Sequence, residues 1–252
     1  MAAVSKFRLK LIAVAALIVT AVLGWHWWSD QQRFTSGQQT GLFTTLPILW
    51  AEADSIQGML RGTAESHWAR TALANGGGIV PLDVLAAPGQ LGPLGGLQQL
   101  VIAQPRPLSP DENVALDRWV RQGGRVLLLA DPALTEDSGF AIGDRRRPQS
   151  SVLLSPILKR WGLDLIFDDG QVMAARSVTF KDSAVPVILP GKFIASDPRA
   201  CRVQAEGVIA VCTIGRGQVV AVADASVLER SDADGTRAAA FRALLSAAFN
   251  PR

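Results

Sequence analysis

The clearest pattern of apolar and polar positions predicts a strand–helix–strand unit over residues 98–130. Residues 98–103 form an apolar run of the length typical of a buried strand. Residues 109–112 (SPDE) combine a capping serine, a first-turn proline and the glutamate of a capping box, so a helix is expected to begin there. The glycines at 123–124 end that helix. The uninterrupted apolar run at 126–130 then predicts a strand covered on both faces, as in a parallel sheet.

Strand and helix patterns alternate along the rest of the chain as well. We expect a helical region at residues 46–73, strands at 79–85 and 217–224, a helix within 151–161, loosely patterned strands at 163–180, an irregular excursion with three prolines at 181–199, and a closing helix whose apolar side is made by Phe241, Leu244, Leu245 and Ala248. This alternation indicates an α/β domain with a mostly parallel sheet.

The amino-terminal region has the pattern of a membrane anchor. Residues 11–28 contain no Lys, Arg, Asp or Glu, and as a helix they would span roughly 27 Å, close to the ~30 Å hydrocarbon core of a bilayer. Basic residues precede the segment and three tryptophans lie near its end, which predicts one span in the cytoplasmic (inner) membrane, in contact with lipid. The expected order is cytoplasmic residues 1–10, transmembrane anchor 11–28, tether 29–45 and extracytoplasmic (periplasmic) α/β domain 46–252. A cleaved signal peptide is the alternative, which the bulky tryptophans at the exit disfavour.

The net charge of +3 is concentrated at the amino terminus. Lys6, Arg8 and Lys10 account for the whole excess, and the other 22 basic residues are balanced by 22 acidic ones. An exported domain with no net charge does not have the electrostatic character of a nucleic-acid-binding protein. We therefore expect no nucleic acid among its partners.

Two cysteines, Cys201 and Cys212, suit an exported location, where disulfides persist. They flank an apolar stretch that is expected to form a hairpin around a two-residue turn at 206–207, which would place the cysteines opposite each other. We expect a disulfide between them, and two separate buried thiols are the alternative. A metal site is not expected, because His26 and His67 are the only histidines and neither lies near the cysteines in sequence.

The candidate binding residues follow predicted strands. Asp131 and Asp224 each end a buried parallel strand, and ligands of open α/β sheets bind beyond those ends. Two carboxylates there could hold Mg²⁺ or act as an acid–base pair, whereas the simpler interpretation is that each caps the segment after its strand. Arg145, Arg146 and Arg147 form a basic cluster in a polar loop, which could meet an acidic partner or anionic headgroups, or remain solvated.

Motifs of catalysis and of cofactor binding are missing from the sequence. No cysteine follows a predicted strand into a sharp turn with a histidine nearby, and no G-x-S-x-G elbow occurs. The motif G-x-x-x-x-G-K-[ST] is absent too, so the chain is not expected to be an ATPase. We predict no catalytic residue and no cofactor.

Several segments resemble the auxiliary component of gliding-motility-type ABC transport systems and the related membrane-anchored domains of unknown function that share its fold. The similar segments are LQQLVIAQPRPLSPDENVALDRWVRQGGRVLLLADP, SPILKRWGLDL (155–165), GRGQVVAVADASVLE (215–229) and FRALLSAAF (241–249). The resemblance implies a three-layer domain that is flavodoxin-like or class I amidotransferase-like and lacks a catalytic triad. It also implies an ABC permease and an ATPase on other chains as partners.

These observations lead us to expect a non-enzymatic, single-span accessory protein of an ABC-type system, which binds through the loops around Asp131, Arg145, Arg146, Arg147 and Asp224. One alternative is an exported hydrolase or carbohydrate-binding protein that uses the carboxylates at the strand ends. Another is an envelope-assembly scaffold unrelated to transport.

Overall fold

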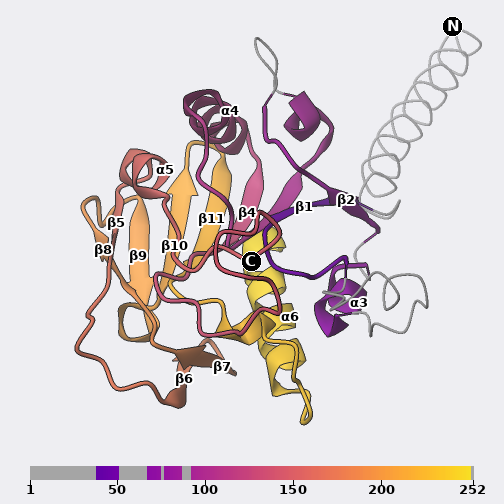
Figure 1. The fold of residues 1–252 in the computed structure, drawn as a ribbon. Helices are drawn as coiled ribbons and strands as arrows, with labels where there is room; N and C mark the ends of the chain where they lie inside the picture. Colours follow the sequence, from indigo (N-terminus) through magenta and orange to yellow (C-terminus); the bar gives the residue numbers. More distant parts are fainter. Residues whose placement is uncertain (1–37, 51–66, 75–76, 87–91, 251–252) are drawn as a thin grey trace, which may run out of the picture. The chain divides into compact units, whose positions relative to one another are not determined.

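A seven-stranded sheet forms the centre of the part of the chain that the computed structural model describes, residues 38–50, 67–74, 77–86 and 92–250. Its strands are β1 (Thr40–Thr44), β2 (Ile79–Pro81), β3 (Gln99–Ala103), β4 (Arg125–Leu129), β9 (Cys201–Gln204), β10 (Ile209–Ile214) and β11 (Gly217–Val222). They lie in the order β2-β1-β3-β4-β11-β10-β9 (Figure 1). The pairs from β2 to β11 are parallel, and β10 and β9 complete the sheet as an antiparallel pair.

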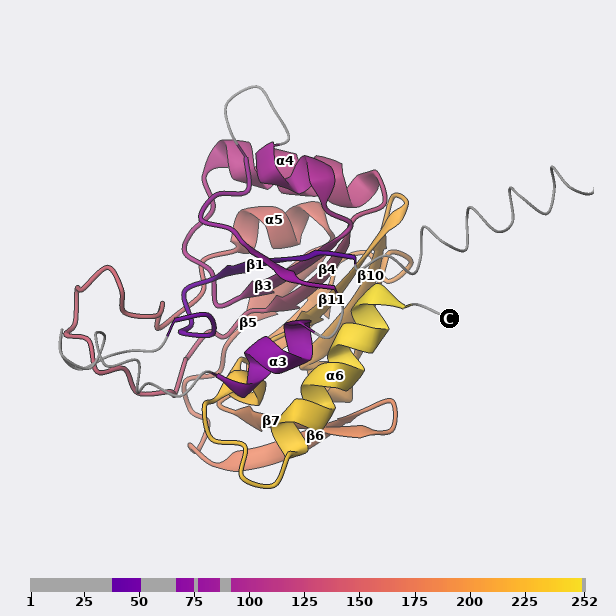
Figure 2. The same ribbon diagram turned by 90° about the vertical axis from the view of Figure 1, so that its right-hand side faces the viewer.

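Helices cover both faces of this sheet. They are α3 (Trp68–Ala74), α4 (Pro110–Arg121), α5 (Ser155–Arg160) and α6 (Thr236–Phe249), with short 3₁₀ turns η1 (Gly92–Gly96), η2 (Ala205–Gly207) and η3 (Ser226–Leu228). Figure 2 shows α4 and α5 on one face and α3 and α6 on the other, so the domain has three layers. The mixed α/β architecture with a mostly parallel sheet is confirmed. Counted among themselves, the parallel strands have the order 2-1-3-4-5, one of the common doubly wound orders.

The core consists of one apolar cluster on each face of the sheet, because successive side chains of a strand point to opposite faces. Leu100 and Ile102 of β3 belong to the cluster under α4, whereas Val101, between them, belongs to the cluster under α6. In β4, Leu128 likewise belongs to the cluster under α4 and Leu127 to the cluster under α6. A strand buried on both sides has to be apolar at every position, which is why β3 and β4 are continuous apolar runs in the sequence.

The strongest helix prediction is confirmed in detail. The hydroxyl of Ser109 accepts a hydrogen bond from the main-chain N–H of Glu112, and the carboxylate of Glu112 accepts one from the N–H of Ser109. After Arg121 the chain leaves the helix through Gly123, whose φ of 118° lies in the region that favours glycine. At Gly124 a Cβ atom would come within 2.4 Å of the Trp119 ring, so the close packing of helix and strand requires glycine there.

The amino-terminal part of the domain differs from the prediction. Residues 29–45 were expected to be a tether, but Thr40–Thr44 is strand β1, which lies between β2 and β3. The sequence does not predict β1, because its apolar stretch is short and is flanked by threonines. The hydroxyl of Thr44 donates to the carbonyl of Ala103, which satisfies a polar group inside the sheet. The helical region expected at 46–73 is wrong for residues 46–50, which form bends, and is confirmed at its end by α3. Residues 51–66 lie outside the described part of the chain.

The segment expected to be an irregular excursion contains ordered strands instead. Two antiparallel ribbons lie beside the main sheet: β5 (Leu163–Ile166) pairs with β8 (Lys192–Ala195), and β6 (Ala175–Phe180) pairs with β7 (Ser183–Ile188). Pro186 lies within β7. A proline is tolerated there because β7 pairs with β6 alone, so the position without an N–H can face away from the partner strand.

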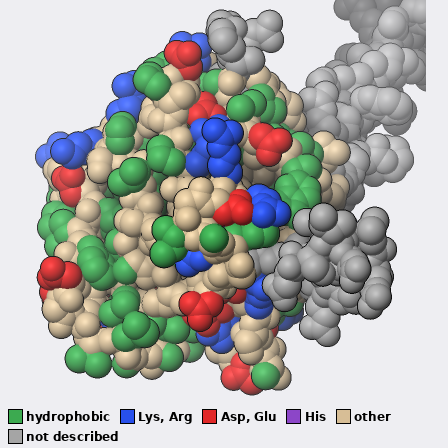
Figure 3. Space-filling view, in the orientation of Figure 1, with side chains coloured by type: hydrophobic (Ala, Val, Ile, Leu, Met, Phe, Trp, Pro, Cys, Tyr) green, Lys and Arg blue, Asp and Glu red, His purple; other side chains and the backbone are tan. Residues whose placement is uncertain are grey.

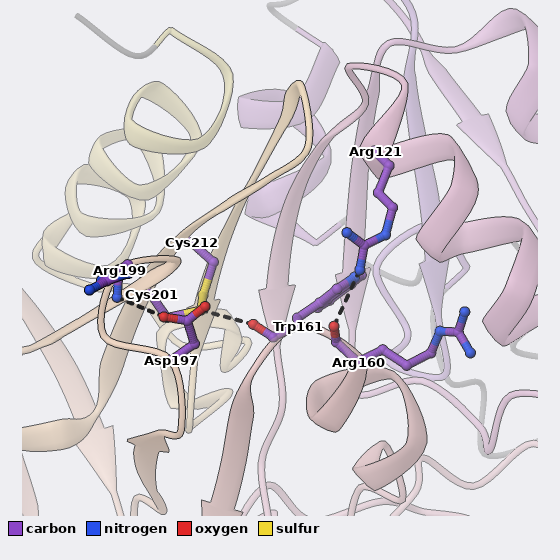
Figure 4. The surroundings of a disulfide bond; sticks show 7 residues. All are labelled: Arg121, Arg160, Trp161, Asp197, Arg199, Cys201 and Cys212. Atoms are coloured by element: carbon purple, nitrogen blue, oxygen red, sulfur yellow. Dashed lines mark hydrogen bonds between the residues drawn. A yellow bond between two sulfur atoms is a disulfide. The ribbon is translucent and has the colours of Figure 1, made fainter.

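The predicted disulfide is confirmed. Cys201 of β9 lies opposite Cys212 of β10, with 4.0 Å between their Cα atoms, and the two form a disulfide (Figure 4). The pairing was predicted correctly, although the turn is longer than expected: residues 205–208 connect the strands, and residues 205–207 have positive φ. Figure 4 also shows Trp161, which is buried at the end of α5 close to the disulfide.

The predicted anchor at residues 11–28 and the cytoplasmic residues 1–10 lie outside the described part of the chain, as does His26. In the described part, no helix combines the length and the apolar character needed to cross a membrane.

Reduction of the disulfide should destabilise the domain. The bond joins residues 11 positions apart, and cross-links over loops of that size typically contribute about 2–4 kcal/mol to the free energy of unfolding. Denaturant unfolding with and without reductant measures the difference, and the variant Cys201→Ala/Cys212→Ala should not respond to reductant. A wild-type unfolding curve that is the same in both conditions, or two free thiols in the purified protein, would contradict this prediction.

Candidate functional site

The carboxylates of Asp131 and Asp224 are neighbours beyond the ends of β4 and β11, as expected, but both are buried. Asp131 is 0% exposed and Asp224 is 1% exposed. The oxygens of Asp131 accept hydrogen bonds from the main-chain N–H groups of Ala133 (2.8 Å) and Ala225 (3.1 Å). Those of Asp224 accept from Ser226 (2.6 Å) and Ile188 (2.9 Å). All four oxygens therefore pair with the main chain.

Burial of these two carboxyl groups shapes their titration. Burial raises the pKa of Asp131 and of Asp224, and the charge of Asp131 raises that of Asp224 further. The N–H donors lower both pKa values without cancelling the effect of burial. Neither carboxylate reaches solvent, and the binding role expected of the two residues stays a prediction. The simpler interpretation, that each carboxylate fixes the loop after its strand, agrees with their contacts.

Gln104 connects these loops to the rest of the edge, a role that the sequence did not reveal. Its side-chain N–H groups donate to the carbonyls of Asp131 (3.0 Å) and Gln149 (2.7 Å), while its side-chain oxygen accepts from the N–H of Asp131 (2.9 Å). The main-chain carbonyl of Gln104 accepts from the N–H and the hydroxyl of Thr45. The ends of β1, β3 and β4 are thereby joined through the side chain and the main chain of one fully buried residue.

A cavity of about 480 Å³ opens next to this network, beyond the ends of β1 and β2. The strand order reverses between β1 and β3, and doubly wound sheets bind ligands in the crevice at that point. The volume lies within the range typical of small-molecule sites. The lining includes Phe43, Trp50, Arg106, Phe140, Arg145 and Arg146.

Arg106 is held in one orientation at the wall of the cavity. Its guanidinium makes two hydrogen bonds to the carboxylate of Glu112, at 2.7 and 2.9 Å, and lies 5.0 Å from the centre of the Phe43 ring. Burial would raise the pKa of Glu112, but hydrogen bonds from Arg106 and from the N–H groups of Ser109 and Leu85 lower it to about 2. The carboxylate that caps α4 is thus charged at neutral pH and fixes a cavity-lining arginine.

The three arginines of the predicted basic cluster have three different positions. Arg145 and Arg146 line the cavity. Arg146 also pairs with Asp144, at 2.7 Å, and its guanidinium lies 4.3 Å from the centre of the Phe140 ring. Arg147 does not line the cavity, because its guanidinium donates to the main-chain carbonyl of Phe140 inside the loop. The structure therefore brings Arg145 and Arg146 to a cavity and leaves Arg147 inside the loop, while binding by any of the three stays a prediction.

Arg106 and the aromatic side chains were missed by the sequence analysis. Arg106 follows the end of β3 by three positions and Asp131 follows the end of β4 by two, so the rule that ligands bind beyond strand ends could have identified Arg106 as well. The aromatic residues carry no such signal, since Phe43 belongs to a strand that was not predicted. Among the described residues, no three His, Cys, Asp or Glu side chains gather in a way that could hold a metal ion.

Comparison with known families locates a similarity in this same part of the chain. Residues 79–181 match the family model described as "ABC-type uncharacterized transport system". The matched segment runs from β2 through β6 and contains Arg106, Arg145 and Arg146, but not β1 or the carboxyl-terminal third of the domain. No curated protein matches the chain.

Solved structures show weak similarity, with 13% sequence identity in each of three cases. An exo-beta-1,4-mannosidase, Op5Man5, from Opitutaceae bacterium strain TAV5 has a TM-score of 0.47 over 86% of this chain and 36% of its own. A beta-galactosidase from Bacillus circulans sp. alkalophilus has 0.46 over 84% and 31%. Cytoplasmic Protein STM3548 from Salmonella typhimurium has 0.46 over 82% and 97%. The chain thus spans about a third of the length of the two glycosidases.

Replacing Glu112 with Gln should destabilise the domain at neutral pH and alter its acid response. A folded-state pKa lowered from 4.5 to about 2 gives stability that is complete above pH 4.5 and is lost as the pH falls towards 2. We expect a loss of about 2 kcal/mol at pH 7, after allowance for the partly exposed Arg106. Denaturant unfolding from pH 3 to pH 7 tests this, with the exposed Asp111→Asn on the same helical turn as control. Equal losses in the two variants would contradict the prediction.

Asp131 and Asp224 should give the opposite dependence on pH. A carboxyl group whose folded-state pKa is raised stabilises the fold below its unfolded-state pKa, and this stability is lost as the pH rises through the folded-state pKa. The wild-type free energy of unfolding should therefore fall from about pH 4 to about pH 8. Asp224→Asn should flatten this slope, whereas Asp182→Asn, at an exposed turn, should leave it unchanged. A slope that persists in Asp224→Asn would show that the buried pair is not its source.

Proposed function

We propose that this chain is a non-catalytic accessory component of an ABC-type transport system, held in the cytoplasmic membrane by residues 11–28 with its α/β domain outside the cytoplasm. The observation that carries the proposal is the match of residues 79–181 to the transport-system family. The ATPase and the permease would be separate chains, because this sequence has no G-x-x-x-x-G-K-[ST] motif and one long apolar segment. An anchor would keep the domain at high effective concentration beside those subunits.

The contacts of the buried carboxylates support a role without catalysis. A general acid or base has to come within hydrogen-bonding distance of its substrate. The oxygens of Asp131 and Asp224 are occupied by main-chain N–H groups and lie beneath the surface. The alternative of an exported hydrolase that uses this pair has no comparable support from the geometry.

An exposed apolar surface on the β5–β8 ribbon supports a role that depends on a protein partner. Ile166 and Ile194 are diagonal neighbours across the two strands and are 48% and 52% exposed, and Phe167 follows directly and is 40% exposed. Figure 3 shows hydrophobic side chains at the left of the view, over β5 and β8. Exposed apolar side chains that are neighbours on one face of a ribbon, as Ile166 and Ile194 are, are a feature of protein–protein contacts. We call Ile166, Phe167 and Ile194 the ribbon surface.

Capture of the tagged full-length chain from its native membranes tests the proposal. Mass spectrometry should find an ATPase with a P-loop motif and a polytopic permease in the captured complex. The variant Ile166→Asp/Ile194→Asp should reduce their recovery about tenfold or more, because a charge in a desolvated contact is strongly unfavourable. Ile142→Asp introduces a charge at a loop residue that is 95% exposed and should not reduce recovery.

The experiment has outcomes that contradict the proposal clearly. If the wild-type chain is captured without any ATPase or permease, the transport role is wrong. If the subunits are recovered but all three proteins retain them equally, the transport role stands and the ribbon surface is not the contact. Circular dichroism of each variant shows that the comparison is made between folded proteins.

A further inference from the structure

The cavity beyond the ends of β1 and β2 is lined by charged side chains as well as by apolar ones, unlike the ribbon surface. Phe43 and Leu82 are buried side chains that contribute to its lining. Trp50 lines it as well and is 64% exposed, so one aromatic ring of the cavity is open to solvent. A molecule in the cavity would therefore meet apolar surface as well as charge.

The charges that face the cavity are mainly positive. Arg106, Arg145 and Arg146 belong to the lining, and Asp83 is the acidic residue among the lining side chains. The carboxylates that pair with Arg106 and Arg146 are those of Glu112 and Asp144, and neither belongs to the lining. The pairing thus orients two guanidinium groups while leaving both at the wall.

Hydrogen-bond donors remain available on these arginines. Arg146 pairs with Asp144 through Nε and Nη2, which leaves Nη1 without an acceptor among the described residues. The guanidinium of Arg145 has no acceptor in the described part of the chain. Guanidinium groups can only donate, and their preferred partners are carboxylate and phosphate oxygens.

The hydroxyl groups of the lining, in contrast, are already in use. Thr44 donates to the carbonyl of Ala103 and accepts from the N–H of Leu46. Thr45 donates to Gln104 and accepts from the N–H of Gln149. The acceptors that remain in the lining side chains belong to one carboxylate, that of Asp83, against three guanidinium groups, so donors predominate and the arrangement favours an anion.

We propose that the cavity binds a small organic anion, in which a carboxylate or phosphate group is attached to an apolar ring or chain. The charged group would lie against Arg145 and Arg146, and the apolar part would lie near Phe43 and Trp50. This inference deepens the proposed accessory function, since it gives the extracytoplasmic domain a ligand to respond to. Its test uses the purified chain alone, so either proposal can fail without the other.

Phenyl phosphate is a suitable probe because it combines both features, and calorimetric titration of the full-length chain in neutral detergent measures its binding. We expect a dissociation constant on the order of 1 mM, as for a probe of this size in a formed pocket. Arg145→Ala/Arg146→Ala should weaken binding about tenfold or more, because it removes charge-assisted hydrogen bonds. Both residues are exposed, so the variant should fold.

Arg199→Ala/Arg202→Ala is the matched control. These two exposed arginines lie at the other end of the sheet, by β9, and their loss changes the net charge by the same amount. The control should bind phenyl phosphate with wild-type affinity. Inorganic phosphate and benzyl alcohol, which carry the charge and the ring separately, should each bind at least about tenfold more weakly than the combined probe.

Four results would overturn the inference. The first is the absence of saturable binding at phenyl phosphate concentrations up to about tenfold above the expected dissociation constant. The second is equal weakening of phenyl phosphate binding in the two double variants. The third is binding of benzyl alcohol, and the fourth is binding of inorganic phosphate, with the same affinity as phenyl phosphate. The second would indicate general attraction by net charge, the third an apolar site, and the fourth an ionic contact that does not use the aromatic residues.

Discussion

The carboxyl edge of the sheet depends on one constraint: main-chain polar groups that lose water must find partners within the protein. The loops after β3, β4 and β11 meet there, and three buried polar side chains satisfy them. Gln104 joins the ends of β1, β3 and β4, while Asp131 and Asp224 hold the loops that follow their strands. Burying two carboxyl groups costs free energy, but each carboxyl oxygen accepts a hydrogen bond from a main-chain N–H group that has lost its water, and these bonds offset the cost. Thr45, which donates to Gln104, also lines the neighbouring cavity, so this network borders the cavity.

A third buried carboxylate, that of Glu112, links helix formation to the same cavity. Glu112 completes the capping box of α4 and also holds Arg106 through two hydrogen bonds. The same glutamate that starts the helix therefore positions the guanidinium of Arg106, 5.0 Å from the centre of the Phe43 ring. The capping role alone would be met by a solvent-exposed glutamate. Its burial indicates that the helix start and the cavity wall are one structural unit, since loss of the carboxylate would release both.

Local sequence signals accounted for much of the fold, and contacts between distant segments accounted for what was missed. The strands around α4 and the pairing of Cys201 with Cys212 were predictable, because capping residues, apolar runs and a hairpin act over a few positions. Strand β1 was not, since its neighbours β2 and β3 begin 39 and 59 residues further along the chain. Pro186 was similarly misleading, because a proline excludes a central strand but not one that pairs on a single side.

The basic cluster shows why residue type alone could not define the site. Arg145, Arg146 and Arg147 are equivalent in the sequence, where they are three successive cations in a polar loop. In the folded loop one guanidinium supports the main chain, one pairs with Asp144 beside an aromatic ring, and one has no acceptor among the described residues. Since a guanidinium that is already saturated by the protein has little left to offer a ligand, recognition is determined by the partners of each arginine. The number of cations therefore overestimates such a site, whereas the hydrogen bonds show that Arg145 and Arg146 keep donors without an acceptor among the described residues.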